Sequence, residues 1–181
     1  VFPSRECFFE AIQSNGRKII SVGRFSPEKG HERLIDAFYE YRKKNANDWL
    51  IIMGGVSAGD EFEKRIDQIQ RLGLEKNVIL LLRVSNPFPI VKACDYFILS
   101  SFYEGFGLVL AEADILGKPV VSTDIAGARD FMQEHGGVLV ENSMAGIQKG
   151  LFMLSTNAVQ PMHIDYEAYN RDVVCEFESM L

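Results

Sequence analysis

Six short, continuously apolar runs divide the sequence at regular intervals, and longer amphipathic stretches lie between and after them. Runs of about four to six apolar residues without alternation are typical of strands buried on both faces, as in a parallel sheet covered by helices on each side. The order of strand and helix therefore predicts right-handed crossovers and a doubly wound, Rossmann-like α/β fold with a six-stranded parallel sheet. The predicted strands cover residues 18–23, 49–54, 77–82, 96–101, 119–124 and 137–141.

The stretches outside these runs have the periodicity of helices. Leu34, Phe38 and Tyr41 recur at spacings of four and three, which places them on one face of a helix. Gly73 ends another such stretch, as glycine commonly does after a helix. The predicted helices cover residues 31–44, 61–72, 87–94, 107–116, 127–134, 143–154 and 166–180.

Length and composition indicate one globular domain. The chain has 181 residues, of which 47% are hydrophobic and 24% charged, and this composition excludes disorder as an overall description. Residues 1–16 precede the alternating pattern, so we expect a connector that leads into a domain of residues 17–181. The first residue is Val1 rather than methionine, and we expect the sequence to be part of a longer protein.

Charge and cysteine content exclude several classes of function. The net charge of −6 argues against broad attraction to nucleic acid or to an anionic membrane. No apolar run approaches the roughly 18 residues that a membrane span needs. The three cysteines are widely spaced and form no CxxC pair, which argues against a disulfide framework and a zinc site. A reducing cytoplasm is the expected setting.

The first predicted strand is followed by a loop of residues 23–30 that begins and ends in glycine and carries Arg24 and Lys29. The loop matches neither the G-x-G-x-x-G dinucleotide fingerprint nor the P-loop motif. Arginine can bind phosphate oxygens in bidentate fashion and lysine adds a point charge, so the two cations suit a diphosphate. The alternative is a surface loop in which Glu28 pairs with one of the two cations.

The fourth predicted strand is followed by Glu104, Gly105 and Gly107, and Glu112 lies on the next helix. The glycines let the backbone approach a ligand closely, and the start of the helix offers free N–H groups to an anion. The two carboxylates are expected to flank one pocket, where they could accept hydrogen bonds from sugar and ribose hydroxyls. Two alternatives stay open: a carboxylate pair for glycoside hydrolysis, or two solvated acids at a helix start.

These motifs together resemble family four of the retaining glycosyltransferases, which have the GT-B fold. The resemblance runs from about residue 16 to the end of the chain and is carried by the loop 23–30, by E-G-F-G at 104–107 with Glu112 eight residues after Glu104, and by G-K-P-V-V at 117–121. It implies the C-terminal half of such an enzyme, which binds the nucleotide-sugar donor. Residues 1–16 would then connect from an N-terminal acceptor domain absent from this chain, and the helix 166–180 would end the donor domain.

The resemblance also implies the roles of individual residues. Arg24, Lys29 and Glu104 would be catalytic: the two cations neutralise the departing diphosphate, and Glu104 holds the hydroxyls of the donor sugar. The N–H group of Leu108 would reach phosphate and Glu112 would bind ribose. The resemblance implies a front-face substitution, so no protein nucleophile is assigned. No metal site is expected, because no D-x-D motif stands at a strand end. The full set of expected substrate-binding residues is Gly23, Gly105, Phe106, Gly107, Leu108, Glu112, Arg83 and Val84, the last two contacting the base.

The activity that the resemblance implies is the transfer of a hexosyl group from a nucleoside-diphosphate sugar, a UDP-sugar in preference to a GDP-sugar, without a cofactor. The acceptor would be a glycan or a lipid-linked or cell-surface polysaccharide, bound through the N-terminal domain, so this chain alone is expected to be inactive. The full-length protein is expected in the cytoplasm, peripheral to the inner face of the membrane. The alternatives are a GT-B relative with other chemistry, such as a sugar-nucleotide epimerase or a phosphorylase, and a non-catalytic nucleotide-binding module.

Overall fold

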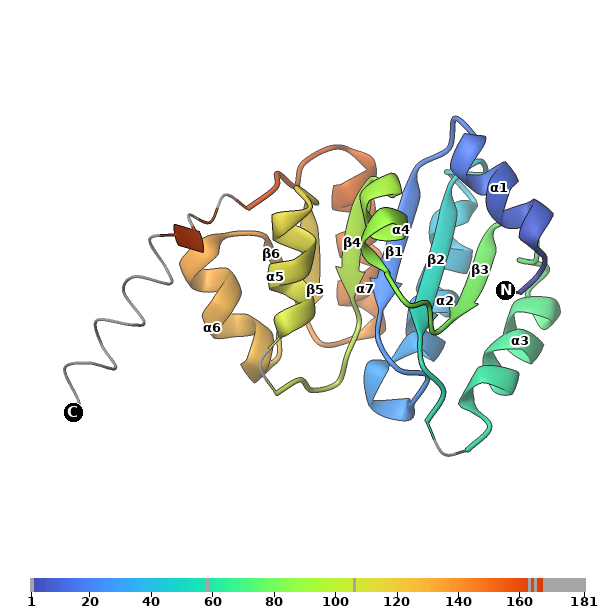
Figure 1. Ribbon diagram of the computed structural model, residues 1–181, viewed down its shortest axis with the longest axis horizontal. Helices are drawn as coiled ribbons and strands as arrows, with labels where there is room; N and C mark the ends of the chain where they lie inside the picture. Colours follow the sequence, from blue (N-terminus) through green and yellow to red (C-terminus); the bar gives the residue numbers. More distant parts are fainter. Residues whose placement is uncertain (1, 58, 106, 163, 165, 168–181) are drawn as a thin grey trace.

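The computed structural model describes residues 2–57, 59–105, 107–162, 164 and 166–167. Within them, six strands form one parallel sheet in the order β3-β2-β1-β4-β5-β6 (Figure 1). This order confirms the predicted doubly wound sheet, because the chain runs outward from β1 in one direction and then from β4 in the other. The strands are β1 (Lys18–Val22), β2 (Trp49–Gly54), β3 (Val78–Leu82), β4 (Tyr96–Leu99), β5 (Val120–Thr123) and β6 (Val138–Val140).

Helices cover both faces of the sheet (Figure 1). One face packs against α2 (His31–Arg42), α3 (Glu61–Arg71) and α7 (Met144–Ser155). The other packs against α1 (Arg5–Gln13), α4 (Phe88–Ala93), α5 (Leu108–Ile115) and α6 (Ala126–His135). A short 3-10 helix, η1 (Pro27–Lys29), lies in the loop after β1.

Burial on both faces explains why the strands are continuously apolar. In β2, Leu50 and Ile52 belong to the core beneath α2, while Ile51 and Met53 belong to the core beneath α4 and α5. Successive side chains of a strand point to opposite faces, so a strand with no solvated face has few positions for polar residues, here the small Ser21, Ser122 and Thr123. The loops after the strands' carboxyl ends gather at one edge of the sheet, the lower edge in Figure 1.

The predicted strands match the observed ones to within two residues, and so do the helices, with two differences. The helix predicted at residues 166–180 lies outside the described residues apart from 166–167. The sequence pattern does not predict helix α1, since residues 1–16 lie before the alternation of strands and helices.

Helix α1 forms part of the domain's core. Its N-cap residue Ser4 accepts a hydrogen bond from the Cys7 N–H at 3.2 Å, and Ala11 is completely buried. Just before it, Phe2 and Leu80 exchange backbone hydrogen bonds of 2.9 and 2.8 Å. The segment expected to be a connector therefore packs on one face of the sheet and pairs with its edge strand β3, while its link to a further domain stays a prediction.

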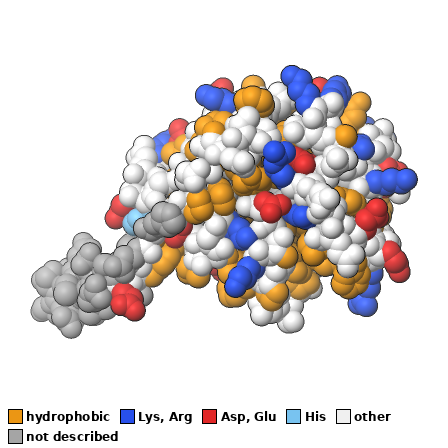
Figure 2. All heavy atoms as spheres, turned by 90° about the horizontal axis from the view of Figure 1, so that it is seen from above, with side chains coloured by type: hydrophobic (Ala, Val, Ile, Leu, Met, Phe, Trp, Pro, Cys, Tyr) orange, Lys and Arg blue, Asp and Glu red, His pale blue; other side chains and the backbone are white. Residues whose placement is uncertain are grey.

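The surface of the described residues carries mixed charges. Figure 2 shows Lys and Arg side chains intermixed with Asp and Glu side chains over the face that it presents, without a continuous region of either sign. Among the described residues, no helix is both long enough and apolar enough to cross a membrane.

Close contact at Gly54 connects the end of β2 to the loop after β1. A Cβ atom added at Gly54 would lie 1.9 Å from the carbonyl oxygen of Gly23, which is shorter than any real contact. At the neighbouring Gly55, an added Cβ would meet nothing within 4 Å. A side chain would therefore clash at Gly54 but not at the adjacent Gly55.

We therefore expect Gly54→Ala to lower the free energy of unfolding by about 1 to 3 kcal/mol, the usual cost of overpacking. The reason is that the methyl group must displace the backbone at Gly23. Urea denaturation followed by circular dichroism measures the change, with Gly55→Ala as the control. Equal midpoints for the two variants would show that the contact does not constrain the fold.

Candidate functional site

The strand order reverses between β1 and β4, and parallel α/β sheets bind ligands beyond the carboxyl ends of the strands at such a point. The structure has a pocket of about 410 Å³ there. The loop after β1 forms one side of it, and the loop after β4 with the start of α5 forms the other. Its described lining consists of Val22, Gly23, Arg24, Lys29, Glu104, Gly107, Leu108, Val109 and Glu112.

Lys29 and Glu104 form an ion pair across this pocket. The Lys29 ammonium donates to both carboxylate oxygens of Glu104, at 2.6 Å to Oε1 and 2.7 Å to Oε2. Both side chains are largely buried, with exposed fractions of 15% and 13%. The aliphatic stem of Lys29 passes over Gly23, where a Cβ atom would lie 3.2 Å from the lysine Cδ. The pair is thus held in place on both sides of the pocket.

Serines at the end of β4 position Glu104 and the loop after β1, a role that the sequence did not predict for them. The Ser101 hydroxyl donates to Glu104 Oε1 at 2.7 Å. The Ser100 hydroxyl donates to the carbonyl oxygen of Lys29 at 3.0 Å. Two adjacent serines after an apolar strand are a weak signal in the sequence, which does not identify their partners. In the structure both are completely buried.

Arg33 on α2 joins this helix to the loop after β4 and to Asn142 after β6, a role that the sequence also did not predict. Its guanidinium donates to the carbonyl oxygens of Ser100 at 2.7 Å and Ser101 at 2.9 Å, and to Asn142 Oδ1 at 2.6 Å. It also lies 3.8 Å from the ring centroid of Phe102. No signal in the local sequence separates Arg33 from a solvated helix residue, because its partners lie about 70 and 110 positions away.

Arg24 lies at the outer rim of the pocket. Its side chain is 68% exposed, and its Nη2 atom lies 3.6 Å from Glu28 Oε1. Glu28 in turn accepts a hydrogen bond from the Ser26 hydroxyl at 2.5 Å. The sequence alternative in which Glu28 pairs with Arg24 is thus present in the structure, but only as a long and exposed contact, which contributes little to stability.

The first turn of α5 closes the pocket on its other side. Gly107 is the N-cap residue and has a φ of 60°, a left-handed conformation that favours glycine. The following residue, Leu108, is 73% exposed, so the start of the helix is accessible. Glu112 stands on the same helix and is also exposed. The positive end of the helix dipole and a carboxylate therefore border one space.

A neighbouring hollow of about 420 Å³ continues past Glu104 to Gly105 and to the first turn of α6. Gly127 allows this approach, since an added Cβ there would lie 2.4 Å from the carbonyl oxygen of Glu104. Phe106, expected to bind substrate, lies outside the described residues.

The structure does not bring Arg83 and Val84 to the pocket. They follow β3, which is separated from β1 by β2, so they lie about 10 Å or more to the side. Arg83 is exposed, and Val84 packs against the core beneath α4. Their contact with a nucleotide base stays a prediction. Within the described part of the chain, no three His, Cys, Asp or Glu side chains are arranged to hold a metal ion.

His31, the first residue of α2, is buried beside the loop that carries Lys29. Its exposed fraction is 4%, and its ring meets that of Phe25 edge to face at 5.3 Å. Burial lowers the pKa of His31 to about 3, with further lowering from Arg65 and Lys29 and an opposing effect of Glu28. The imidazole is therefore neutral in the folded protein at neutral pH.

Comparison with known proteins identifies relatives. Residues 5–171 match the family model described as glycosyl transferases group 1. A Campylobacter jejuni protein named N-acetylgalactosamine-N,N'-diacetylbacillosaminyl-diphospho-undecaprenol 4-alpha-N-acetylgalactosaminyltransferase is 36% identical over 134 residues, which make up 73% of this chain and 35% of that relative. The chain spans about a third or less of the length of the curated relatives that it matches.

Solved structures are also similar to this chain. Anabaena HepE in complex with UDP and glucose has a TM-score of 0.69 and 29% identity, over 84% of this chain and 43% of HepE. A glycosyltransferase from Rickettsia africae has a TM-score of 0.74 at 22% identity, over 84% of this chain and 41% of that chain, and this likeness supports the fold alone. The expected Rossmann-like domain of the GT-B type is thereby confirmed.

The buried ion pair predicts a coupling between its two members. Removing one partner leaves the other charge uncompensated, whereas removing both does not. We expect Lys29→Met and Glu104→Gln each to lower the free energy of unfolding, and the double variant to lose less than the sum by about 0.5 to 3 kcal/mol. Urea denaturation of the four proteins measures this. Strictly additive losses would contradict the pairing.

His31 predicts a dependence of stability on pH. In the unfolded chain the imidazole titrates near its ordinary pKa, so between about pH 6.5 and pH 3 only the unfolded chain binds this proton. Stability is therefore lost as the pH falls through this window. We expect His31→Gln to flatten the curve of unfolding free energy against pH by up to about 1.4 kcal/mol per pH unit between about pH 6 and pH 4. Parallel curves would exclude a neutral, buried histidine.

Proposed function

The chain belongs to the group 1 glycosyl transferases, and we propose that it binds the donor of a retaining enzyme that transfers a hexosyl group from a UDP-sugar. One observation carries the proposal: Lys29, Glu104, Glu112 and the start of α5 border a single pocket at the point where the strand order reverses. The UDP and glucose bound by HepE, at 29% identity, support this choice of donor.

Lys29 is suited to bind the diphosphate without leaving Glu104. An ammonium group has three N–H donors, and the two bonds to Glu104 use two of them. The third can donate to a phosphate oxygen. Negative charge grows on the diphosphate as the glycosidic bond breaks, and a fixed cation in a largely buried place stabilises that charge.

Glu104 is suited to hold one hydroxyl of the donor sugar. Its carboxylate offers about four acceptor positions, of which Lys29 takes two and Ser101 one. The remaining position on Oε2 can accept from a hydroxyl. Because its charge is already shared with Lys29, Glu104 is a weak nucleophile, and we assign no protein nucleophile to the reaction.

Arg24 and α5 complete the recognition of the nucleotide. Arg24 is exposed and only loosely paired, so its guanidinium can turn to a phosphate at little cost. The free N–H groups at the start of α5, including that of Leu108, can donate to the same anion. Glu112 would accept hydrogen bonds from the ribose hydroxyls. With these cations and N–H groups, we propose that the donor binds without a metal ion or a cofactor.

In the proposed reaction an acceptor hydroxyl attacks the anomeric carbon on the face that the diphosphate leaves. The new bond joins the acceptor oxygen to this carbon, the bond to the phosphate oxygen breaks, and the hydroxyl proton passes to the leaving phosphate. The acceptor would be a glycan or a lipid-linked or cell-surface polysaccharide held by an N-terminal domain. We propose that the whole enzyme acts in the cytoplasm at the inner face of the membrane, and that this chain alone binds donor but transfers nothing.

Titration calorimetry with UDP, GDP and ADP tests the proposed donor site. We expect UDP to bind most tightly. Lys29→Ala and Glu112→Ala should each weaken binding by about 1 to 3 kcal/mol, because each removes a charge-assisted hydrogen bond.

Lys149→Ala and Glu63→Ala are matched controls, since both residues are exposed and neither lines the pocket. Failure of all three nucleotides to bind would contradict the proposed function. Unchanged affinity in both site variants would contradict the site assignment while leaving the fold intact.

A further inference from the structure

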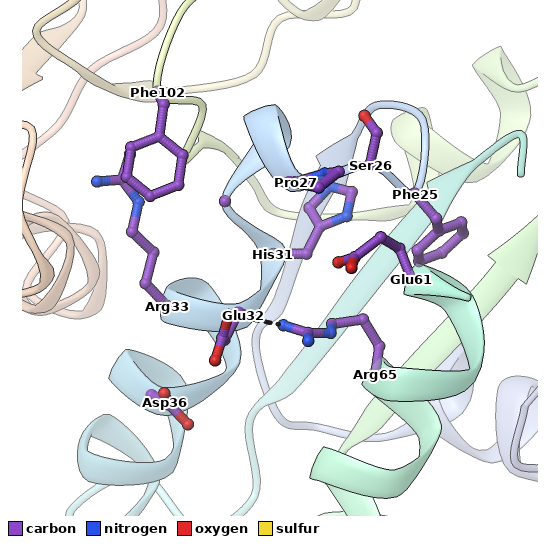
Figure 3. A pocket seen from close by; sticks show the side chains of 11 residues that line it. Phe25, Ser26, Pro27, His31, Glu32, Arg33, Asp36, Glu61, Arg65 and Phe102 are labelled. Carbon is purple, nitrogen blue, oxygen red and sulfur yellow. Dashed lines mark ion pairs between the residues drawn. The ribbon is translucent and has the colours of Figure 1, made fainter. Parts of the chain in front are cut away.

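A second pocket, of about 360 Å³, lies between α2, α3 and the loop after β1 (Figure 3). Pro27 and Gly30 of this loop border it, whereas Arg24 and Lys29 border the donor pocket, and the two pockets share no lining residue. The volume falls in the range of small-molecule sites, roughly 300 to 1,000 Å³. The second pocket has no part in the function proposed above.

Arg65, which extends from α3 into the wall of the second pocket, is buried without sufficient partners. Its side chain is only 8% exposed, and its Nε and Nη1 atoms form no hydrogen bond within the described part of the chain. The nearest carboxylate oxygen belongs to Glu32 and lies 3.6 Å from Nη1, beyond hydrogen-bond distance, on a side chain that is 72% exposed. These two atoms have almost no accessible surface, so a ligand in the pocket can reach only Nη2, the third nitrogen of the guanidinium, which is not among the enclosed atoms. This N–H₂ group, with no hydrogen bond in the described part of the chain, favours a ligand that brings oxygen acceptors.

The other charged groups of the wall restrict the charge of that ligand. Glu32, Asp36 and Glu61 supply three carboxylates against the guanidinium groups of Arg33 and Arg65. A phosphate or a dicarboxylate would face the three carboxylates, and an amine or a metal ion would face Arg65. An uncharged ligand that both donates and accepts hydrogen bonds avoids both conflicts.

The carboxylates have acceptor positions to spare. Asp36 accepts from Gln68 at its Oδ1 atom, at 2.7 Å, and Glu61 accepts from Lys64 at its Oε1 atom, at 3.0 Å. Each carboxylate has a second oxygen that could take a hydroxyl. Figure 3 shows Glu61 pointing into the same space as His31, from the opposite wall.

An aromatic ring at the rim completes the pocket. Phe102 is 51% exposed, and Arg33 lies over it at 3.8 Å from the ring centroid. Most N–H groups of Arg33 already donate to Ser100, Ser101 and Asn142, so its main role is to hold the ring of Phe102. The apolar C–H groups of a ring-shaped polyol can pack on the exposed part of Phe102.

We propose that this pocket, separate from the donor pocket, binds a neutral saccharide of one or two rings. Arg65 donates to its ring or hydroxyl oxygens, Asp36 and Glu61 accept from its hydroxyls, and Phe102 contacts its apolar face. This combination of donors, acceptors and one aromatic ring suits an uncharged polyol and no charged metabolite.

Nuclear magnetic resonance of the ¹⁵N-labelled protein tests the proposal, with glucose, N-acetylglucosamine, maltose and sucrose as probes and inorganic phosphate as the anionic comparison. We expect at least one sugar to shift the backbone signals of residues 25–33 and 61–65 in a saturable way, with a dissociation constant in the millimolar range. Arg65→Gln and Asp36→Asn should each weaken this binding at least tenfold. Arg71→Gln, an exposed arginine on the same helix, should leave it unchanged.

The proposal would be overturned by no saturable shift in these segments with any sugar, by saturable binding of phosphate there instead, or by sugar affinity that is unchanged in both site variants. Shifts confined to residues 104–112 would place the sugar in the donor pocket and also overturn it. If Arg65→Gln fails to fold, Asp36→Asn alone carries the test. Nucleotide binding is measured separately, so either proposal can fail without the other.

Discussion

The backbones after β1 and β4 touch at Gly30, where a Cβ atom would lie 2.2 Å from the carbonyl oxygen of Ser100. The loop after β1 can therefore cross the end of β4 only because this residue has no side chain and tolerates a φ of 63°. The Phe102 N–H donates to the Glu28 carbonyl at 2.8 Å, and Ser100 donates to Lys29 from the other strand end. These contacts hold the two loops against each other, so that Lys29 reaches Glu104. Both pockets are lined by residues of these loops.

The same junction gives one loop two environments. On one side, Lys29 stands in a polar pocket that belongs to the point where the strand order reverses. On the other, Pro27 and Gly30 border a space whose wall includes the buried Arg65. Arg33 fastens the loop after β4 to α2 between them. A ligand in either pocket would contact a rigid, hydrogen-bonded segment, so binding there requires little ordering of the chain.

The candidate site was predictable in part. The loop with Arg24 and Lys29 and the acids Glu104 and Glu112 could be singled out because each follows a predicted strand, and the structure places all four around one pocket. Their roles in binding stay predictions. The role of Ser101 could not be predicted from the sequence, because its hydroxyl positions Glu104 through a 2.7 Å hydrogen bond that depends on the conformation of the loop.

Hydrophobic periodicity alone determined the order of strands and helices, because strands buried on both faces must be continuously apolar and helices must carry one apolar stripe. It did not reveal α1, whose residue Ala11 is buried only because the helix packs across the sheet. Nor could it choose between Glu28 and Glu104 as the partner of Lys29. In the tertiary structure the partner is Glu104, 75 residues away, because the strand order places β4 beside β1. The sequence around Lys29 contains no information about which strand lies next to β1.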